Sequence, residues 1–199
     1  MIYSGLDWSE DVGGPLGYIA IVHVHEADLP NLETELAAAR RRLGRDSDYV
    51  FKHVGAKENV HHVFYNAITA IPSLKAHLYR YDRSNWNLQH AKAADGDACV
   101  CDGIITLTLG CPADLVDDQI LLIDLPRRER DVLQAFRTAI RQSMRQAHRA
   151  PFRSIKPHPD HRLEGGIVQA ADMLAGEVRE QSGIGGPFLG SLGSRVRMV

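Results

Sequence analysis

The run QILLID, residues 119–124, is short, almost wholly apolar and closed by an acid. A continuous apolar run without polar alternation is typical of a strand that is buried on both faces at the centre of a sheet. Ligands collect at the sheet edge where such strands end in α/β folds. The run therefore predicts a central strand that presents Asp124 at this edge.

Strands and helices alternate on the N-terminal side of this run. A short first strand ending at Asp7, the turn cluster Gly13-Gly14-Pro15 and the β-branched run LGYIAIVHV predict a hairpin. The segments that follow show either helical spacing of apolar residues or the alternation of a half-buried strand. We expect a helix from Asn31 to Leu43, a strand at Tyr49–Val54, a helix at Lys57–Ile71, a strand at Leu74–Tyr81 and a mainly helical segment at Asn85–Leu109.

The C-terminal side continues the alternation. An amphipathic helix at Arg128–His148, a short strand at Phe152–Lys156 and a helix at Gly166–Arg179 are predicted. Alternating elements of this kind, with a hairpin at the start, favour an α/β fold with a mixed sheet flanked by helices. We expect one domain over residues 1–182 and an irregular, glycine-containing tail over 183–199.

Composition restricts the class of protein. The 199 residues include 44% hydrophobic ones, an ordinary share for a globular core, and no run approaches the roughly 20 apolar residues of a membrane span. The first residues are acidic and lack the basic region of a secretory signal. Cys99, Cys101 and Cys111 are an odd set without the paired Cys-x2-Cys spacing of zinc sites. We expect core thiols in a reducing, cytoplasmic compartment.

Three carboxylates occupy positions that suit metal chemistry. Asp7 and Asp124 are expected at strand ends, and Asp172 lies in the last helix among apolar residues. Acids from two strands and a helix can converge on a divalent cation, and Mg²⁺ and Mn²⁺ prefer such oxygen ligands. Other interpretations stay open: a strand-end acid also serves turns and helix caps, and an arginine would satisfy Asp172 in a salt bridge.

Basic residues are concentrated in one predicted helix, although the chain has 23 basic and 25 acidic residues and a net charge of −2. Arg137, Arg141, Arg145 and Arg149 recur every four residues and so share one helix face. A face of this kind suits the phosphates of a nucleic acid. The alternative is a solvated face paired with nearby acids.

The segment GGIVQAADMLAGEV, residues 165–178, resembles the Gln-x-Ala-Asp-x-Leu-Ala-Gly signature of the domain of unknown function 3800 family. That family opens with a strand ending in Asp-Glu-Ser-Gly, where this chain has Asp7-Trp8-Ser9-Glu10. The apolar strand LGYIAIVHV, the pair Phe51-Lys52 and the run LLID also match the family in order. The resemblance covers most of the chain, and only its C-terminal signature is specific.

The resemblance implies an RNase H-like fold, as in integrases and related nucleases. It also implies phosphodiester cleavage with two metal ions, Mg²⁺ or Mn²⁺, held by Asp7, Asp124 and Asp172. Lys52 would contact the scissile phosphate, and Glu10, where the family has glycine, is a further candidate ligand. On this basis we expect a metal-dependent nuclease-like enzyme whose substrate is nucleic acid, contacted by Lys52, Arg137, Arg141 and Arg145. The alternatives are a non-catalytic nucleic-acid-binding or regulatory protein of the same fold, and a small-molecule phosphohydrolase.

Overall fold

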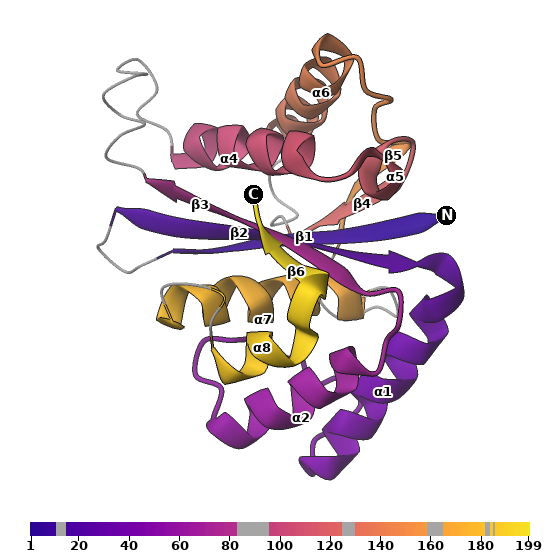
Figure 1. Ribbon diagram of the computed structural model, residues 1–199, viewed down its shortest axis with the longest axis vertical. Coiled ribbons are helices and arrows are strands. Elements are labelled where there is room, and N and C mark those ends of the chain that lie inside the picture. Colours follow the sequence, from indigo (N-terminus) through magenta and orange to yellow (C-terminus); the bar gives the residue numbers. More distant parts are fainter. Residues whose placement is uncertain (11–14, 83–95, 125–129, 159–164, 182–183, 185) are drawn as a thin grey trace.

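A mixed sheet divides the molecule into two helical layers (Figure 1). The computed structural model describes residues 1–10, 15–82, 96–124, 130–158, 165–181, 184 and 186–199. Within them the sheet has six strands in the order β5-β4-β1-β2-β3-β6. The strands are β1 (Ile2–Glu10), β2 (Leu16–His25), β3 (Lys75–Asp82), β4 (Ile120–Ile123), β5 (Ser154–Pro157) and β6 (Val196–Met198).

The helices cover both faces of the sheet. One layer contains α1 (Leu29–Arg42), α2 (Glu58–Thr69), α7 (Gly165–Gln181) and α8 (Pro187–Leu192), and the other contains α4 (Gly96–Gly110), α5 (Ala113–Val116) and α6 (Arg130–Gln146) (Figure 1). Two short 3-10 helices lie at Glu26–Asp28 and Gly193–Arg195. We call the two sides of the sheet the α7 face and the α4 face. None of the helices described is long and apolar enough to cross a bilayer.

The strand pairing explains why β1 and β4 lie at the centre. β1 and β2 form the predicted antiparallel hairpin, and β3 continues it antiparallel to β2. β4 runs parallel to β1, with Leu6 opposite Ile123, and β5 runs parallel to β4. All four residues of β4 are buried, as expected for a strand covered on both faces.

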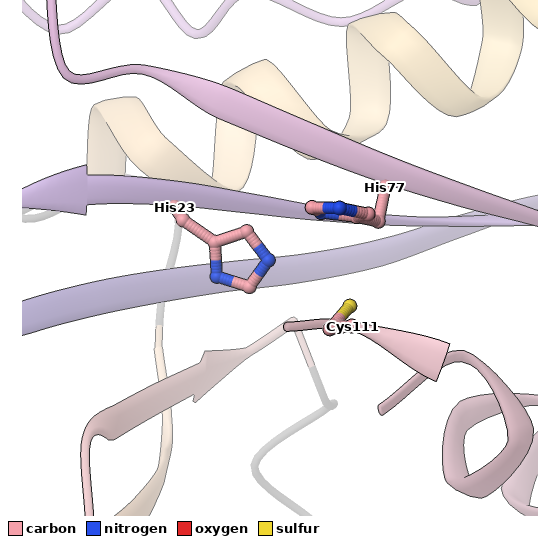
Figure 2. A group of neighbouring side chains, drawn as sticks. All are labelled: His23, His77 and Cys111. Atoms are coloured by element: carbon pink, nitrogen blue, oxygen red, sulfur yellow. The ribbon is translucent and has the colours of Figure 1, made fainter. Parts of the chain in front are cut away.

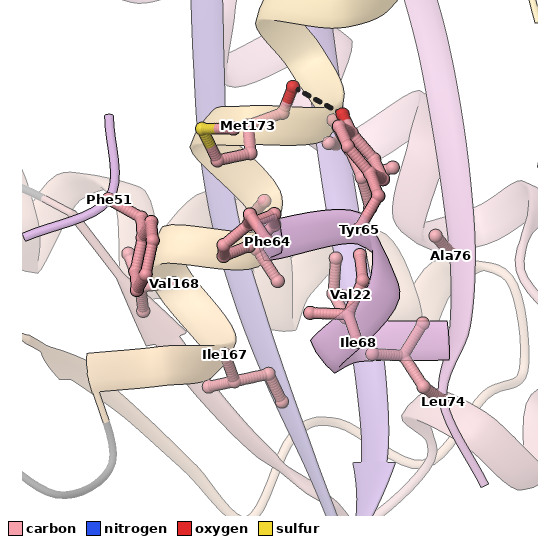
Figure 3. Close-up of a cluster of buried hydrophobic side chains, with 14 of the residues drawn as sticks. Val22, Phe51, Phe64, Tyr65, Ile68, Leu74, Ala76, Ile167, Val168 and Met173 are labelled. Carbon is pink, nitrogen blue, oxygen red and sulfur yellow. Dashed lines mark hydrogen bonds between the residues drawn. The ribbon is translucent and has the colours of Figure 1, made fainter. Parts of the chain in front are cut away.

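Side chains of the strands alternate between the two faces of the sheet and so belong to two separate hydrophobic cores. Leu6, Ile21 and Ile123 belong to the core under α4 and α6, whereas Ala20 and Leu122 belong to the core under α7. The α7-face core is dense with aromatic side chains from α2 and the segment before it, and the Tyr65 hydroxyl donates a hydrogen bond of 3.0 Å to the carbonyl of Met173 on α7 (Figure 3). Truncating such a side chain to alanine typically costs about 3–5 kcal/mol.

Helix α7 lies unusually close to β1. A β-carbon added at Gly5 would come within 2.5 Å of the carbonyl oxygen of Ile167 and within 2.8 Å of the amide nitrogen of Val168. These neighbours are backbone atoms and cannot rotate away, so only glycine fits at this position. The close approach fixes the distance between the helix and the middle of the strand.

Most predicted elements are confirmed. The hairpin, the strands at β3, β4 and β5, and helices α1, α2, α6 and α7 lie where the sequence placed them. Helix α1 starts at Leu29 after Asp28, rather than at Asn31. Of the segment 85–109, α4 confirms the helical prediction from Gly96 onward, and the prediction for 85–95 lies outside the described residues.

Three predictions are corrected. The first strand does not end at Asp7 but continues to Glu10, so Asp7 lies inside β1. The segment 49–54 is not a strand. The tail 183–199 is not irregular: it contains α8 and β6, and β6 extends the sheet parallel to β3 with Ala76 opposite Val196. The glycines of the tail give no strand pattern, and the partner strand β3 lies far away in the sequence.

Candidate functional site

Asp7 and Asp124 lie on neighbouring parallel strands. Leu6 is paired with Ile123, and the amide of Asp124 donates a hydrogen bond of 3.2 Å to the carbonyl of Leu6. The two acids therefore occupy the next position of the ladder. The alternation of each strand directs them to the same side, because Leu6 and Ile123 both pack on the α4 face. Both side chains are thus directed to the α7 face, where they are half-buried.

Helix α7 supplies the third acid. Asp172 is half-buried and lies five residues after Ile167, the residue that contacts Gly5. The antiparallel partner of Asp7 is Ala20, a small residue of the α7-face core. The sheet thus brings Asp7 and Asp124 to the face that α7 covers with Asp172. We call these three residues the carboxylate site.

The charges of the other two acids act on Asp7. Burial raises the pKa of Asp7 well above its usual range, and the charges of Asp172 and Asp124 raise it further. The amide of Trp8, which donates 2.7 Å to Asp7 Oδ1, and the charge of Lys52 lower this pKa by smaller amounts. A group of acids that disfavour one another's ionisation has the donor set and the charge that a divalent cation would neutralise.

The segment before α2 is held by side chains of α7 instead of by a strand. The amide of Phe51 donates 3.1 Å to Gln169 Oε1, and the amide of His53 donates 2.8 Å to Asp172 Oδ2. Arg40 completes the arrangement by donating from Nε to the carbonyl of Tyr49 at 2.7 Å. The three-residue spacing of Gln169 and Asp172 places them on one helix face, where they receive alternate amides of an extended segment. We call this arrangement the backbone clamp.

The backbone clamp includes two residues that the sequence predicted as functional, Asp172 and Lys52. Asp172 Oδ2 accepts a hydrogen bond from the backbone amide of His53, a partner that the sequence did not suggest. Lys52, between the two clamped amides, is exposed, and its charge acts on Asp7. The structure therefore brings Lys52 to the carboxylate site.

A buried group of polar side chains lies next to the backbone clamp. Glu177, one turn beyond Asp172 on α7, accepts a hydrogen bond of 3.0 Å from His61 Nδ1 and another from Gln181. His53 Nε2 lies 3.7 Å from Glu177 Oε2. Although burial opposes ionisation of Glu177, its bonds to His53 and His61 lower its pKa to about 2.

Sequence reasoning overlooked His53 and Glu177. One signal was available, since Glu177 stands between Gly176 and Val178 on the apolar side of the predicted last helix. An acid in that context needs a partner. His61 points into this cluster while its neighbour His62 points away, as adjacent residues of a helix do: the side chain of His61 is 8% exposed and that of His62 is 61% exposed.

The arginines of α6 are less uniform than their spacing predicted. Arg141 and Arg145 border a shallow hollow on the outer surface of α6 together with Gln134 and Thr138. Arg137 lines the same hollow, but its Nε donates 2.8 Å to the carbonyl of Ile155 in β5. Part of its role is therefore to attach α6 to the edge strand.

Arg149 is not part of this face. The helix ends at Gln146, and Arg149 turns back to bind Asp117 at 2.7 Å and the carbonyls of Thr108, Leu109 and Cys111 at the end of α4. Its guanidinium satisfies free carbonyls of that helix terminus. We interpret Arg149 as a structural residue.

Glu10 does not join the carboxylate site. It lies three residues after Asp7 on β1, so the alternation directs it to the opposite face. There its Oε1 accepts a hydrogen bond of 2.6 Å from the hydroxyl of Tyr81, a residue of the α4-face core. The structure therefore corrects the suggestion that Glu10 is a further metal ligand.

Comparisons with known proteins establish the fold. The chain is similar to ribonuclease H2 from Pyrococcus horikoshii OT3, with a TM-score of 0.59 and 13% identity over 91% of this chain and 73% of that one. It is also similar to a point mutant of Bst-RNase HIII, with a TM-score of 0.52 and 11% identity over 90% of this chain and 52% of that one. The protein has an RNase H-like α/β fold, as the sequence predicted.

The comparisons do not extend to a sequence family. No family model and no curated protein match the chain. The resemblance to the domain of unknown function 3800 family therefore remains a prediction from the motifs. At 11–13% identity the structural neighbours define the arrangement of strands and helices, and function has to be argued from the site.

Proposed function

We propose that the protein is a metal-dependent phosphodiesterase that cleaves nucleic acid at the carboxylate site. The observation that carries this proposal is geometric: Asp7 of β1 and Asp124, directly after β4, occupy adjacent positions on the sheet face that α7 covers with Asp172. The charges of Asp172 and Asp124 both raise the pKa of Asp7, in agreement with this arrangement. Oxygen ligands with excess negative charge fit Mg²⁺ or Mn²⁺ better than softer metals.

Each residue has a defined part in this proposal. Asp7, Asp124 and Asp172 would hold the cations, which would supply activation of a water molecule and neutralisation of charge on the phosphate. Asp172 keeps one oxygen on the amide of His53, which fixes the orientation of its carboxylate. Lys52 is carried to the same place by the backbone clamp, and its ammonium would bind a phosphate oxygen of the substrate.

Binding of the rest of the substrate is assigned to α6. Arg141 and Arg145 present charge on the outer surface of this helix, and phosphate contacts of this kind give affinity independent of sequence. Arg137 contributes from the same hollow while remaining attached to Ile155. These contacts would position a polynucleotide without selecting its bases.

A cleavage assay tests the proposal directly. The protein would be incubated with labelled single-stranded RNA, an RNA–DNA hybrid and duplex DNA, with Mn²⁺, Mg²⁺ or a chelator. We expect metal-dependent cleavage of at least one substrate, and a loss of about 10³-fold or more in Asp7→Asn, because the lost ligand removes the main stabilisation of transition-state charge.

A matched control excludes contaminating nucleases and general effects of removing an acid. Asp118→Asn removes an exposed carboxylate that pairs with Arg153 at 2.6 Å, and asparagine tolerates the positive φ of 55° at this position. It should cleave like the parent. Metal-dependent binding of nucleic acid without cleavage would instead favour a non-catalytic protein, and hydrolysis of small phosphodiesters alone would favour a small-molecule phosphohydrolase.

A further inference from the structure

Two histidines and a cysteine meet on the opposite side of the sheet from the carboxylate site. His23 is on β2, His77 is on β3, and Cys111 follows directly after α4. His77 is paired with Ile21, a residue of the α4-face core, and His23 lies two residues further along the same face of β2. Figure 2 shows the Cys111 sulfur pointing toward the two rings. We call these residues the His–Cys cluster.

The three side chains are close and excluded from solvent. One ligand atom from each lies within 4.8 Å of the others, and the ring centroids of the histidines are 5.3 Å apart at an angle of 68°. His23 is 1% exposed, His77 5% and Cys111 3%. A tetrahedral zinc ion would draw such atoms to roughly 3.5 Å from one another, a change of about 1 Å that small side-chain rotations provide.

Hydrogen bonding leaves metal-binding atoms without partners. His23 Nδ1 is 2.8 Å from Ser4 Oγ, its direct cross-strand neighbour. With the Nδ1 proton donated to Ser4, the lone pair is on Nε2, and this buried atom has no hydrogen-bond partner among the described residues. His77 Nδ1 is also buried without a partner there. Buried ring nitrogens without partners are rare, and a metal would satisfy them.

The backbone around Cys111 is rigidly positioned. Its amide donates 3.1 Å to the carbonyl of Leu107, and its carbonyl accepts 3.0 Å from Arg149. Gly110 packs directly against Val199, so the C-terminal strand covers this end of α4. The backbone that carries the thiol is therefore fixed by α4 and by the C-terminal strand, and both lie far from the histidines in the sequence.

We propose that His23, His77 and Cys111 form a zinc-binding site with His23 Nε2, one nitrogen of His77 and the Cys111 thiolate as ligands and water in the fourth position. Two imidazole nitrogens and one sulfur are a ligand set that zinc takes and that Mg²⁺ does not. On binding, the thiol proton is released to solvent as the sulfur–zinc bond forms. The site does not depend on the proposed nuclease function, because it shares no residue with the carboxylate site.

A second group, in which Glu177 stands in place of the cysteine, also has buried ring nitrogens without hydrogen-bond partners among the described residues, namely Nδ1 and Nε2 of His53. His53, His61 and Glu177 also have ligand atoms within 4.8 Å of one another. There Glu177 already accepts hydrogen bonds from His61 and Gln181 and balances the imidazoles as an acid. Ser4 is neutral, so the His–Cys cluster has no such balancing acid among its ligands. We therefore assign zinc to the His–Cys cluster.

Cobalt substitution tests the site in the unchanged protein. Metal-free full-length protein would be titrated with Co²⁺ in excess Mg²⁺, which occupies oxygen sites. We expect one equivalent to produce the intense visible bands of tetrahedral cobalt and the near-ultraviolet band of a cobalt–thiolate bond, both removed by Zn²⁺. A spectrum without the thiolate band would overturn the proposal.

Variants assign the signal to the cluster. Cys111→Ser should remove the thiolate band and weaken zinc binding by at least about 100-fold, whereas Cys101→Ser, which changes a half-buried thiol outside the cluster, should leave both unchanged. Ser4→Ala should weaken zinc binding by roughly 10-fold, because the tautomer of His23 is no longer fixed. Equal affinity in parent and Cys111→Ser contradicts the proposal, and if Cys111→Ser does not fold, an unchanged affinity in Ser4→Ala does so.

Discussion

The carboxylate site and the His–Cys cluster lie on opposite faces of one sheet and have opposite chemistry. On the α7 face, burial and neighbouring charges raise the pKa of Asp7, so its charged form is disfavoured. On the α4 face, burial lowers the pKa of His23 to about 3, so its charged form is also disfavoured. Loss of hydration is the largest cause of both shifts, and it acts on acids at one site and on imidazoles at the other.

Under the two proposals, the two faces of one sheet would hold ligands for different metals. Three oxygen ligands with excess negative charge favour Mg²⁺ or Mn²⁺, and two neutral nitrogens with a thiol favour zinc. Side chains of β1 alternate between the two faces of the sheet, so this one strand reaches both sites: Ser4 faces the histidines and Asp7 faces α7. Two positions of one strand, three residues apart, would thus contribute to the two proposed sites.

The largest expected effect would separate the two sites completely. Asp7→Asn should lower cleavage by about 10³-fold and leave zinc affinity unchanged, whereas Cys111→Ser should lower zinc affinity by about 100-fold and leave the Mn²⁺-dependent rate constant within about twofold. Rates would be measured by single-turnover cleavage and affinities by competition with a zinc indicator. Loss of both properties in either variant would mean that the faces are coupled.

The second expected effect concerns the two roles of Asp172. Asp172→Asn retains an oxygen that accepts from the amide of His53, whereas Asp172→Ala removes it. We expect Asp172→Ala to lower the free energy of unfolding by about 2 kcal/mol and Asp172→Asn by less than half of that, with cleavage lost in both. Urea unfolding would measure the difference. Full cleavage in a folded Asp172→Asn would remove Asp172 from the metal ligands.

The third effect is smaller and concerns the loss of folding stability that the charge of Asp7 causes when no metal is bound. Because the folded pKa of Asp7 is raised, its ionisation opposes folding, and this cost is absent at acidic pH and grows as the pH rises. In a chelator, Asp7→Asn should therefore be more stable than the parent by on the order of 1 kcal/mol at pH 7, with a smaller gain at pH 4. Thermal melts at both pH values would test this. Saturating Mn²⁺ should reverse the order, since it stabilises only the parent.

The smallest effect concerns the outer surface of α6. Replacing Arg141 and Arg145 with Gln should reduce the slope of log affinity against log salt by about two, with a modest loss of affinity at low salt. Arg137 is left unchanged because it holds Ile155. Replacing Arg41 and Arg42 on α1 provides a control with the same change of charge. Equal slopes in both double variants would show that α6 does not bind the polyanion.

The sequence predicted the parts of the fold whose signals are local. The run QILLID became β4, and the amphipathic pattern before residue 148 became α6. Tyr49–Val54 was predicted wrongly as a strand, and no residue of this segment pairs with the sheet. Its amides are bound instead by Gln169 and Asp172, which no local pattern can show.

The two sites differed in how far the sequence could predict them. Asp7 and Asp124 stand near the ends of apolar runs, and Asp172 stands in a specific motif, so all three were visible as candidates. His23 lies inside a β-branched run and Cys111 follows a glycine, and each is ordinary core material by itself. Only the pairing of β2 with β3 and the position of α4 bring them together, and zinc spacing rules do not cover ligands from three such distant elements.

The backbone clamp has a consequence for how the specificity of this protein can change. Because Gln169 and Asp172 bind the amides of Phe51 and His53, the path of the segment does not depend on which side chain stands between them. Mutations at Lys52 would therefore alter the group offered to a substrate while leaving the three acids where they are. A proline at either clamped position would remove a donor and release the segment. In the proposed enzyme, a substitution at position 52 would thus change the group offered to the substrate without moving Asp7, Asp124 or Asp172.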